Sequence, residues 1–451
     1  MTVTAAEEQA TEHIHGICLK TGPPRRVGVE LEWLVRDARD PARPVSGERI
    51  AAAVAAFGAE KATGIATATA TGLPSSASPG VLPSGGLLTT EPGGQLELSS
   101  LPADSVAECV RATAADLAAL RAAAADAGLE LAGVGLDPLR PPRRVLQLPR
   151  YAAMEAFFDR DGPWGRQMMC GTASVQVCLD AGDDSDGQAG YRWRWRLLHA
   201  LTPVLVAAFA NSPLRDGRPS GWKSSRQQVW ARMDPSRTRP PTLNGTADLP
   251  AAWAEYALDA RVMFVRAQGS EEWSVPDGLR LRDWVRGVDG LRAPTTEDLT
   301  YHLSTLFPPV RPRGHFELRM IDAQPGDGWV VPVAVTSALL SDPRAGDVAM
   351  AAAQRLWDGE GGDSEGGGGR GGFDGAGSDA RDREDLWQRA ARLGPEDPRI
   401  ARASRACFAA ARGALVRQDT PRAILAAVDD FIERYVSKDR CPAADLLEEL
   451  R

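Results

Sequence analysis

Three separate segments of the chain alternate apolar and acidic residues with a period of two. They are RRVGVELEWLVRD at 25–37, LLTTEPGGQLELSS at 87–100 and HFELRMID at 315–322. A period of two is typical of β-strands that have one buried face and one polar face. In the second segment, Pro92, Gly93 and Gly94 predict a turn or bulge that re-aims the residues after it. We therefore expect a sheet with carboxylates along one face.

The remaining segments predict an α+β fold. Further strands are expected at 129–136 and 171–180. Helices are expected from Asp104 to about Ala127, at 190–211, near 250–258 and 295–305, and at 381–412, 420–436 and 442–450. The segments 64–86 and 222–246 read as loops. Strands that come first, with helices inserted and helices last, favour an antiparallel sheet over a regular βαβ alternation.

Composition divides the chain into four regions. Residues 1–24 are polar and predict a mobile leader, and 25–358 predict one catalytic domain. Residues 359–379 hold glycine at 11 of 21 positions, which predicts a flexible loop. Residues 380–451 predict a helical region packed on the catalytic domain.

Several function classes are excluded. The chain has no Gx4GK[ST] and no HExxH motif, and its GxSxG and GxGxxG matches fall in the glycine tract, where composition produces them by chance. A net charge of −8 argues against general nucleic-acid binding. Residues 1–16 lack the features of a signal peptide, the longest apolar stretch is too short to cross a bilayer, and none of the six cysteines forms a CxxC pair. We expect a cytoplasmic protein with reduced thiols and no membrane partner.

The acidic strand residues are candidates for metal binding. Glu30 and Glu32 are two apart and share a face, while Glu97 lies in the second segment and Glu317 in the third, with Arg319 on the same face as Glu317. Clustered carboxylates repel one another unless cations neutralise them. Hard oxygen ligands suit Mg²⁺ or Mn²⁺, ions that often accompany phosphate groups. The alternative is a solvated face with scattered counter-ions.

Arginines in the expected loop at 222–246 supply the opposite charge. Arg226, Arg232, Arg237 and Arg239 lie there among Trp222, Trp230 and Lys223. Guanidinium groups bind carboxylate or phosphate in a bidentate manner. The alternative is an ordinary surface loop, although tryptophans are costly on a mobile surface. The residues alone indicate a metal-dependent site that handles anions, with phosphoryl transfer as a candidate reaction.

Five motifs in order resemble the glutamate–cysteine ligases of the plant and actinobacterial type, closest to the actinobacterial enzymes of ergothioneine biosynthesis. They are VGVELEW (27–33), EPGGQLELSS (91–100), TASVQVCLD (172–180), SSRQQVWARMDPSRT (224–238) and HLSTLFPPVRPRGHFELRMID (302–322). The resemblance covers residues 25 to 325. It implies a curved, antiparallel, glutamine-synthetase-like sheet with flanking helices. It also implies a monomer or small homo-oligomer that acts on ATP, glutamate and cysteine.

The resemblance also implies roles for individual residues. Glu30, Glu32, Glu97 and Glu317 match the acidic positions that hold Mg²⁺, with Gln176 beside them. Arg319 is expected at the transferring phosphoryl group, Arg237 at phosphate or substrate, Arg226 at the glutamate carboxylate, and Thr172 and Trp230 in the substrate pocket. The implied reaction is phosphorylation of the glutamate γ-carboxylate by ATP, followed by displacement of phosphate by the cysteine amine.

Two questions remain open from the sequence. Cys178 stands where relatives usually have Asn, and a thiol is a weak donor and acceptor, so either a substrate contact or only a supporting contact is altered. The amine pocket has no clear motif, so a related carboxylate–amine ligase is the alternative, and a non-catalytic nucleotide-binding protein of the same fold is a remote one. The alternation of 315–322 predicts that Glu317→Gln spares the core.

Overall fold

The computed structural model describes residues 3–58, 79–241, 248–267, 272–358 and 380–450. The centre is an eight-stranded antiparallel sheet in the order β2-β3-β4-β1-β6-β10-β9, with β5 paired to the far half of β1. The strands are β1 (Val27–Asp37), β2 (Gly80–Val81), β3 (Leu87–Thr90), β4 (Leu96–Ser99), β5 (Leu129–Ala132), β6 (Ser174–Leu179), β9 (Val310–Pro312) and β10 (Phe316–Asp322). A separate hairpin joins β7 (Leu214–Arg215) to β8 (Arg218–Pro219). The glycine tract at 359–379 lies outside the described residues.

The register of the sheet brings the acidic positions together. β1 lies between β4 and β6, with Glu32 opposite Glu97 and Glu30 opposite Gln176. The odd-numbered apolar residues of β1, from Val27 to Val35, are all buried, as the alternation predicted. The even-numbered glutamates are therefore held on the other face.

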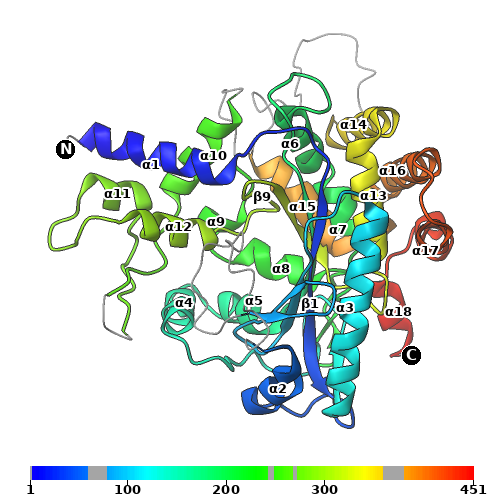
Figure 1. Cartoon of the computed structure of the whole chain (residues 1–451), viewed down its shortest axis with the longest axis horizontal. Helices are drawn as coiled ribbons and strands as arrows, with labels where there is room; N and C mark the ends of the chain where they lie inside the picture. Colours follow the sequence, from blue (N-terminus) through cyan, green and yellow to red (C-terminus); the bar gives the residue numbers. More distant parts are fainter. Residues whose placement is uncertain (1–2, 59–78, 242–247, 268–271, 359–379, 451) are drawn as a thin grey trace.

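Helices cover both faces of the sheet (Figure 1). On one side of β1 lie α3 (Val106–Asp126) and α13 (Val330–Ser341), and on the other lie α4 (Pro149–Asp159), α5 (Trp164–Gly171) and α8 (Ser225–Arg232). α14 (Pro343–Asp358) and α16 (Pro398–Arg417) pack against α13, and α17 (Arg422–Arg434) follows. The others are α1 (Val3–Cys18), α2 (Gly47–Val54), α6 (Tyr191–Ala200), α7 (Thr202–Ala208), α9 (Pro235–Thr238), α10 (Leu249–Asp259), α11 (Leu281–Arg286), α12 (Thr296–Ser304), α15 (Ala380–Leu393) and α18 (Ala443–Glu448). Within the described ranges, no helix is long and apolar enough to cross a membrane.

Most predicted helices are confirmed, with boundaries set by local chemistry. α3 begins after Ser105, whose side chain accepts a hydrogen bond from the Glu108 backbone N–H, and Gly128 follows its end with φ +65°. The helix expected at 190–211 is two helices, α6 and α7, because Pro203 starts a second one. Gly394 and Pro395 likewise separate α15 from α16.

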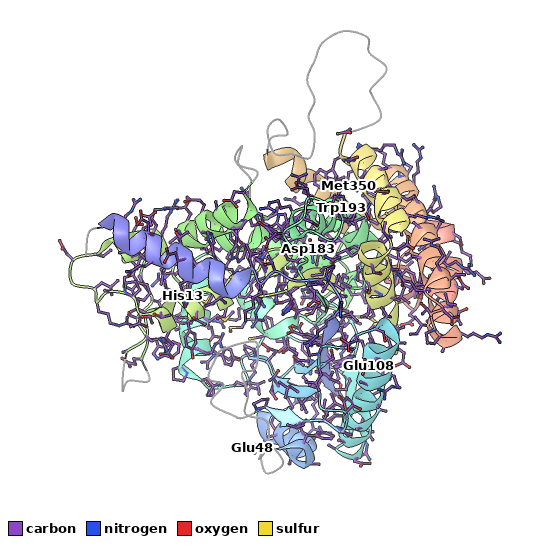
Figure 2. All side chains as sticks on the ribbon, turned by 45° about the horizontal axis from the view of Figure 1, so that its top comes forward. His13, Glu48, Glu108, Asp183, Trp193 and Met350 are labelled. Atoms are coloured by element: carbon purple, nitrogen blue, oxygen red, sulfur yellow. The ribbon has the colours of Figure 1, made fainter. Side chains whose placement is uncertain are left out.

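The expected mobile leader is instead a packed helix. Ala10, Ile14 and Cys18 follow a four-residue spacing and are all buried. α1 packs on α10, α11 and α12, where Glu7 pairs with Arg282 and Arg286. Figure 2 labels His13, on the same helix, whose ring lies 3.2 Å from the Thr300 hydroxyl. The prediction failed because the polar residues of 1–24 hid a narrow apolar stripe.

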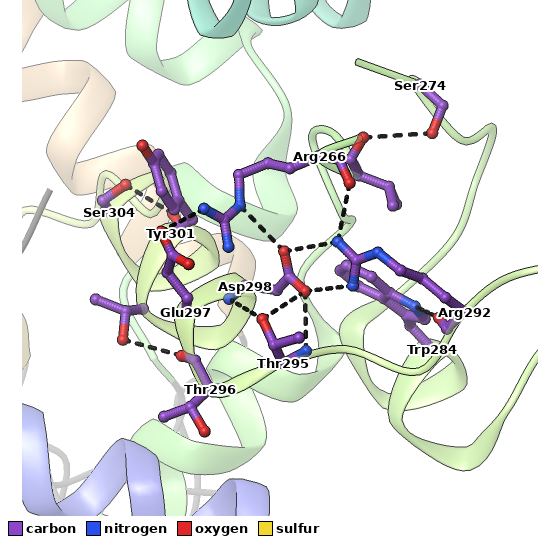
Figure 3. A network of polar contacts seen from close by, with 12 residues as sticks. Arg266, Ser274, Trp284, Arg292, Thr295, Thr296, Glu297, Asp298, Tyr301 and Ser304 are labelled. Carbon is purple, nitrogen blue, oxygen red and sulfur yellow. Dashed lines mark hydrogen bonds and ion pairs between the residues drawn. The ribbon is translucent and has the colours of Figure 1, made fainter. Parts of the chain in front are cut away.

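α12 is anchored by one buried carboxylate (Figure 3). Asp298 accepts hydrogen bonds from Arg266 (3.1 Å), Arg292 (2.5 Å) and the backbone N–H of Thr295 (2.8 Å). The Thr295 side chain completes a capping box at the start of the helix. This anchor holds the helix whose far end delivers Ser304 and Thr305 to the cavity described below.

Candidate active site

One cavity opens on the carboxylate-bearing face of the sheet. Its volume is about 190 Å³. Its charged lining has two signs: the acids Glu30, Glu32, Glu91 and Glu97, and the bases Arg150, Arg226, Arg311, Arg313 and Arg319. The rest of the lining includes Met154, Met168, Met169, Tyr151, Thr172, Gln176, Trp230, Ser304, Thr305 and Phe307.

The acidic side comes from β1, β4 and the turn before β4. Burial raises the pKa of Glu30, and burial together with Glu30, Glu91 and Glu32 raises the pKa of Glu97 well above its usual value. Burial and the charge of Glu32 raise the pKa of Glu91 to about 7. Each shift shows that negative charge is costly here, so the group would be stabilised by a cation.

Glu91 was not predicted as a site residue, and a tight turn places it. The turn closes through a 2.8 Å hydrogen bond from the Glu91 N–H to the Gln95 carbonyl, with Gly94 at φ +87°. Gly93 packs so closely on α5 that a Cβ there would lie 2.2 Å from the Cys170 carbonyl oxygen. Glycine is therefore required at 93 for the turn to reach the cavity wall.

Glu32 is fixed by its neighbours on β6. Ser174 Oγ donates to it at 2.9 Å and Gln176 Nε2 at 2.8 Å. The Gln176 amide oxygen in turn accepts a hydrogen bond from Arg319. Gln176 thus lies between the acidic and basic sides of the cavity.

Glu317 is placed differently from the other predicted metal ligands. It is fully buried and is not part of the cavity lining. Arg311 binds both its oxygens, at 2.8 to 3.1 Å, Arg313 contacts it at 3.4 Å, and Arg319 also donates to it. Despite burial, these guanidinium groups hold the pKa of Glu317 far below its usual value. In this arrangement Glu317 orients three cavity arginines, and its charge also contributes, after burial, to the raised pKa of Glu30.

A bulge in β10 aims Arg319 at the cavity. The pairing of β10 with β6 shifts register between Leu318 and Ile321, which frees backbone carbonyls from the ladder. Arg226 donates to the Arg319 carbonyl at 2.9 Å, and Gln227 donates to the Met320 carbonyl at 2.8 Å. The segment 222–246, expected as a loop, contains α8 and α9 in its described part, 222–241, and α8 is capped by Ser224 and docked on the bulge. Its residues satisfy the backbone that the bulge exposes.

Arg226 is suited to binding an anion from the cavity. It is 1% exposed, and its guanidinium lies over the Trp230 ring at 4.4 Å. Its Nε and Nη1 are buried without a hydrogen-bond partner among the described residues, although Nη1 lies 3.9 Å from Asp322. Trp230 also lines the cavity, so both predicted substrate-binding residues form part of its wall.

Arg237, predicted as a catalytic and nucleotide-binding residue, is not in the cavity. It is fully buried and donates to Asp234 at 2.9 Å, to the Thr305 carbonyl at 2.9 Å and to the Arg261 carbonyl at 2.6 Å. These bonds occupy its guanidinium and hold Thr305 at the cavity wall. The structure therefore gives Arg237 a positioning role, which corrects the prediction.

Thr172 lines the cavity, but its hydroxyl donates a 2.7 Å hydrogen bond to the Met168 carbonyl.

Arg150, at the start of α4, was not predicted from the sequence. Its guanidinium lies 5.3 Å and 5.8 Å from the Tyr151 and Tyr301 ring centroids, and its Nε is buried without a hydrogen-bond partner in the described structure. It is a second arginine suited to an anionic group of a substrate.

The chemistry of the acidic side fits Mg²⁺. Among the described residues, no three carboxylate, histidine or cysteine side chains are grouped tightly enough to hold a metal as they stand. The donor set is nevertheless all carboxylate oxygen, half-buried and mutually repelling, which is the set that hard dications prefer.

The raised pKa of Glu91 predicts that the stability of the folded protein depends on pH. The folded protein binds protons on Glu91 more tightly than the unfolded chain, whose glutamates titrate near their ordinary value of 4.5. As pH rises from about 4.5 through about 7, the folded state must give up these protons, so stability falls. We expect the melting temperature to decrease over this window and Mg²⁺ to recover it at pH 8. A melting temperature independent of Mg²⁺ at pH 8 would contradict a cation site here.

The model of glutamate-cysteine ligase family 2 (GCS2) matches residues 26–360, about three quarters of the chain. The chain belongs to this family. Every charged residue of the cavity lining falls within the range that the family model matches. The predicted membership, and with it the assignment as a ligase, is confirmed.

Named relatives agree with the family. The glutamate–cysteine ligase EgtA of Mycobacterium tuberculosis is 38% identical over 443 residues, which cover 97% of this chain and 88% of the relative. The EgtA of Mycolicibacterium smegmatis is 37% identical, over 96% of this chain and 92% of its own. The chloroplastic glutamate–cysteine ligase of Medicago truncatula is 31% identical over 53% of this chain and 47% of its own.

Solved structures share the fold. The bifunctional glutathione synthetase of Pasteurella multocida superposes with a TM-score of 0.52 at 13% identity, over 99% of this chain and about half (52%) of its own. The glutamate–cysteine ligase of Francisella tularensis, solved with AMP, gives 0.50 at 11% identity over 95% of this chain and 85% of its own. The predicted glutamine-synthetase-like α+β fold is confirmed.

Proposed function

We propose that the protein joins the γ-carboxylate of L-glutamate to the amine of L-cysteine at the expense of ATP, giving γ-glutamylcysteine, ADP and phosphate. The observation that carries this proposal is the division of one cavity into a carboxylate side and an arginine side. Amide formation from a carboxylate requires activation, and phosphoryl transfer requires neutralisation of the charge on the transferred group. The arginine side can neutralise the transferred phosphoryl group, and the carboxylate side can hold the Mg²⁺ that orients the phosphates.

Individual residues have distinct tasks. Glu30, Glu32, Glu91 and Glu97 would hold Mg²⁺, which supplies charge neutralisation and orientation at the phosphates. Arg319, with Arg311 and Arg313 behind it, binds the phosphoryl group on its way to the glutamate γ-carboxylate. Arg226 and Arg150 bind the carboxylate that does not react. The amine then attacks the γ-carbonyl carbon, and phosphate leaves with the electrons of the C–O bond.

Glu317 belongs to the arginine side in this proposal. Its charge holds Arg311, Arg313 and Arg319 together, although like charges would otherwise separate them. A direct contact of Glu317 with Mg²⁺ would require these arginines to move to the phosphates. The proposed metal side therefore rests on the other four carboxylates.

The apolar part of the lining favours cysteine over other amines. Met154, Met168 and Met169 lie in the cavity wall with the rings of Tyr151 and Phe307. Thioether and aromatic groups pack favourably with sulfur and do not satisfy a charged side chain. The alternative, a related ligase that uses a different amine, differs from the proposal at this wall. The product would enter ergothioneine biosynthesis, as the resemblance to the actinobacterial enzymes implies.

The function is tested by ADP release from purified protein with Mg²⁺, glutamate and a panel of amines. We expect ADP only with glutamate and an amine together, and fastest with cysteine, with γ-glutamylcysteine identified by mass spectrometry. Serine, alanine and lysine are the comparison amines, since the first two match cysteine in size and the third carries a charge. Full turnover with another amine while cysteine is inert would establish the alternative.

A further inference from the structure

A group of arginines lies beside the cavity but does not line it. Arg215 and Arg218 face each other across the β7–β8 hairpin, and Arg232 is the last residue of α8. The guanidinium carbon of Arg215 lies 4.8 Å from the ring centroid of Trp164, and that of Arg232 lies 4.5 Å from the same centroid. Two cations thus share one indole at the start of α5.

The positive charge of this group is poorly compensated. Burial and the charge of Arg232 lower the pKa of Arg215, and Asp216, in the hairpin turn, is the one carboxylate that acts in the opposite direction on it. In the described part of the chain, neither Arg218 nor Arg232 makes a side-chain ion pair. By contrast, the nearby Arg166 pairs with Asp159 and Glu155. Facing like charges destabilise a hairpin unless an anion lies between or beside them.

Arg215 also has an unused donor. Its Nη2 donates to Gln167 at 2.8 Å, whereas its Nε is buried and has no hydrogen-bond partner among the described residues. A buried donor without a partner costs free energy, and a bound oxygen atom would remove that cost. Both guanidinium groups already contact the Trp164 ring, so less conformational entropy would be lost on binding than from free arginine side chains.

We propose that Arg215, Arg218 and Arg232, arranged around Trp164, form a binding site for the oxyanion group of a small molecule, either a phosphate or a carboxylate, separate from the catalytic cavity. Guanidinium groups bind both oxyanions through paired N–H donors. The site is connected to catalysis through its helices, because α5 also carries Met168 and α8 carries Trp230 into the cavity wall. An anion bound here would therefore act on substrate affinity from outside the cavity.

The test is equilibrium dialysis of the full chain against radiolabelled inorganic phosphate at fixed ionic strength. We compare the parent with Arg215→Gln/Arg232→Gln, in which the catalytic cavity is intact. We expect the variant to lose one class of phosphate site, with affinity at least about ten-fold weaker. Its turnover at low phosphate should equal that of the parent, which shows that it is folded. The single variant Arg232→Gln changes only an exposed side chain and should show the same direction of effect.

The matched control is Arg405→Gln/Arg412→Gln, which removes the same charge from ion pairs on α16. It should bind phosphate as the parent does. Competition with citrate and with AMP then identifies the source of the oxyanion: displacement by citrate indicates a carboxylate ligand, and displacement by AMP alone indicates a phosphate ester. Equal phosphate binding by the parent and Arg215→Gln/Arg232→Gln, or equal loss in the control, would overturn the proposal.

Discussion

Glu317→Gln is expected both to abolish turnover and to destabilise the fold. Glu317 is fully buried against Arg311, Arg313 and Arg319, so a neutral side chain removes the carboxylate that all three guanidinium groups contact. Removing one partner of a buried ion pair typically costs about 3–5 kcal/mol. The alternation of β10 alone predicted that this change would spare the core, which the arginine contacts contradict. We would measure the melting temperature and ADP release.

Two controls separate charge from shape. Glu130→Gln changes an exposed glutamate on β5 of the same sheet and should leave both measurements unchanged. Glu317→Asp keeps the charge and should recover a large part of the stability lost in Glu317→Gln. A Glu317→Gln protein that melts with the parent would show that the arginines do not depend on this carboxylate.

Glu97→Gln is expected to have the opposite effect on stability. Glu97 lies opposite Glu32 and is repelled by Glu30, Glu91 and Glu32. A neutral side chain removes this repulsion, which lowers the free energy of the folded state at neutral pH. The hydrogen bond from the Thr89 hydroxyl, 3.1 Å long, can be kept by the glutamine carbonyl. We expect a higher melting temperature without Mg²⁺, a smaller increase on adding Mg²⁺, and turnover lower by about 10–100-fold.

The matched control for Glu97→Gln is Glu48→Gln on α2, an exposed glutamate labelled in Figure 2. It should change neither the melting temperature nor its response to Mg²⁺. Opposite shifts in stability for Glu97→Gln and Glu317→Gln would show that the two glutamates belong to different sides of the cavity. Equal destabilisation by both would mean that Glu97 is an ordinary structural residue.

The acidic side of the cavity could be predicted because a strand has a fixed period. Glu30, Glu32 and Glu97 follow from alternation alone, and the register then places Glu32 opposite Glu97. Glu91 could not be found this way, because it lies in a turn whose path depends on the contact of Gly93 with Cys170. Sequence spacing does not encode that contact.

The arginine side of the cavity shows more clearly that residue spacing in the sequence does not predict every side-chain contact. Arg311 lies directly opposite Glu317 in the β9–β10 pair, and Gly314, with φ +77°, turns the chain between them. An Arg-x-Arg pair followed by Gly before an acidic strand was a usable signal for this hairpin. Arg237 was assigned to the site from its motif, but motif position does not say which way a side chain points. Its buried hydrogen bonds to Asp234 and Thr305 show that the Arg237 side chain points away from the cavity.

The most direct test of the proposed chemistry follows one oxygen atom. Glutamate labelled with ¹⁸O in the γ-carboxylate is incubated with the protein, ATP, Mg²⁺ and cysteine, and the released phosphate is analysed by mass spectrometry. If the cavity activates glutamate by phosphorylation, one ¹⁸O atom passes into phosphate for each γ-glutamylcysteine formed, because the bond broken is between carbon and the labelled oxygen. Phosphate that contains no ¹⁸O, with γ-glutamylcysteine still produced, would contradict the account.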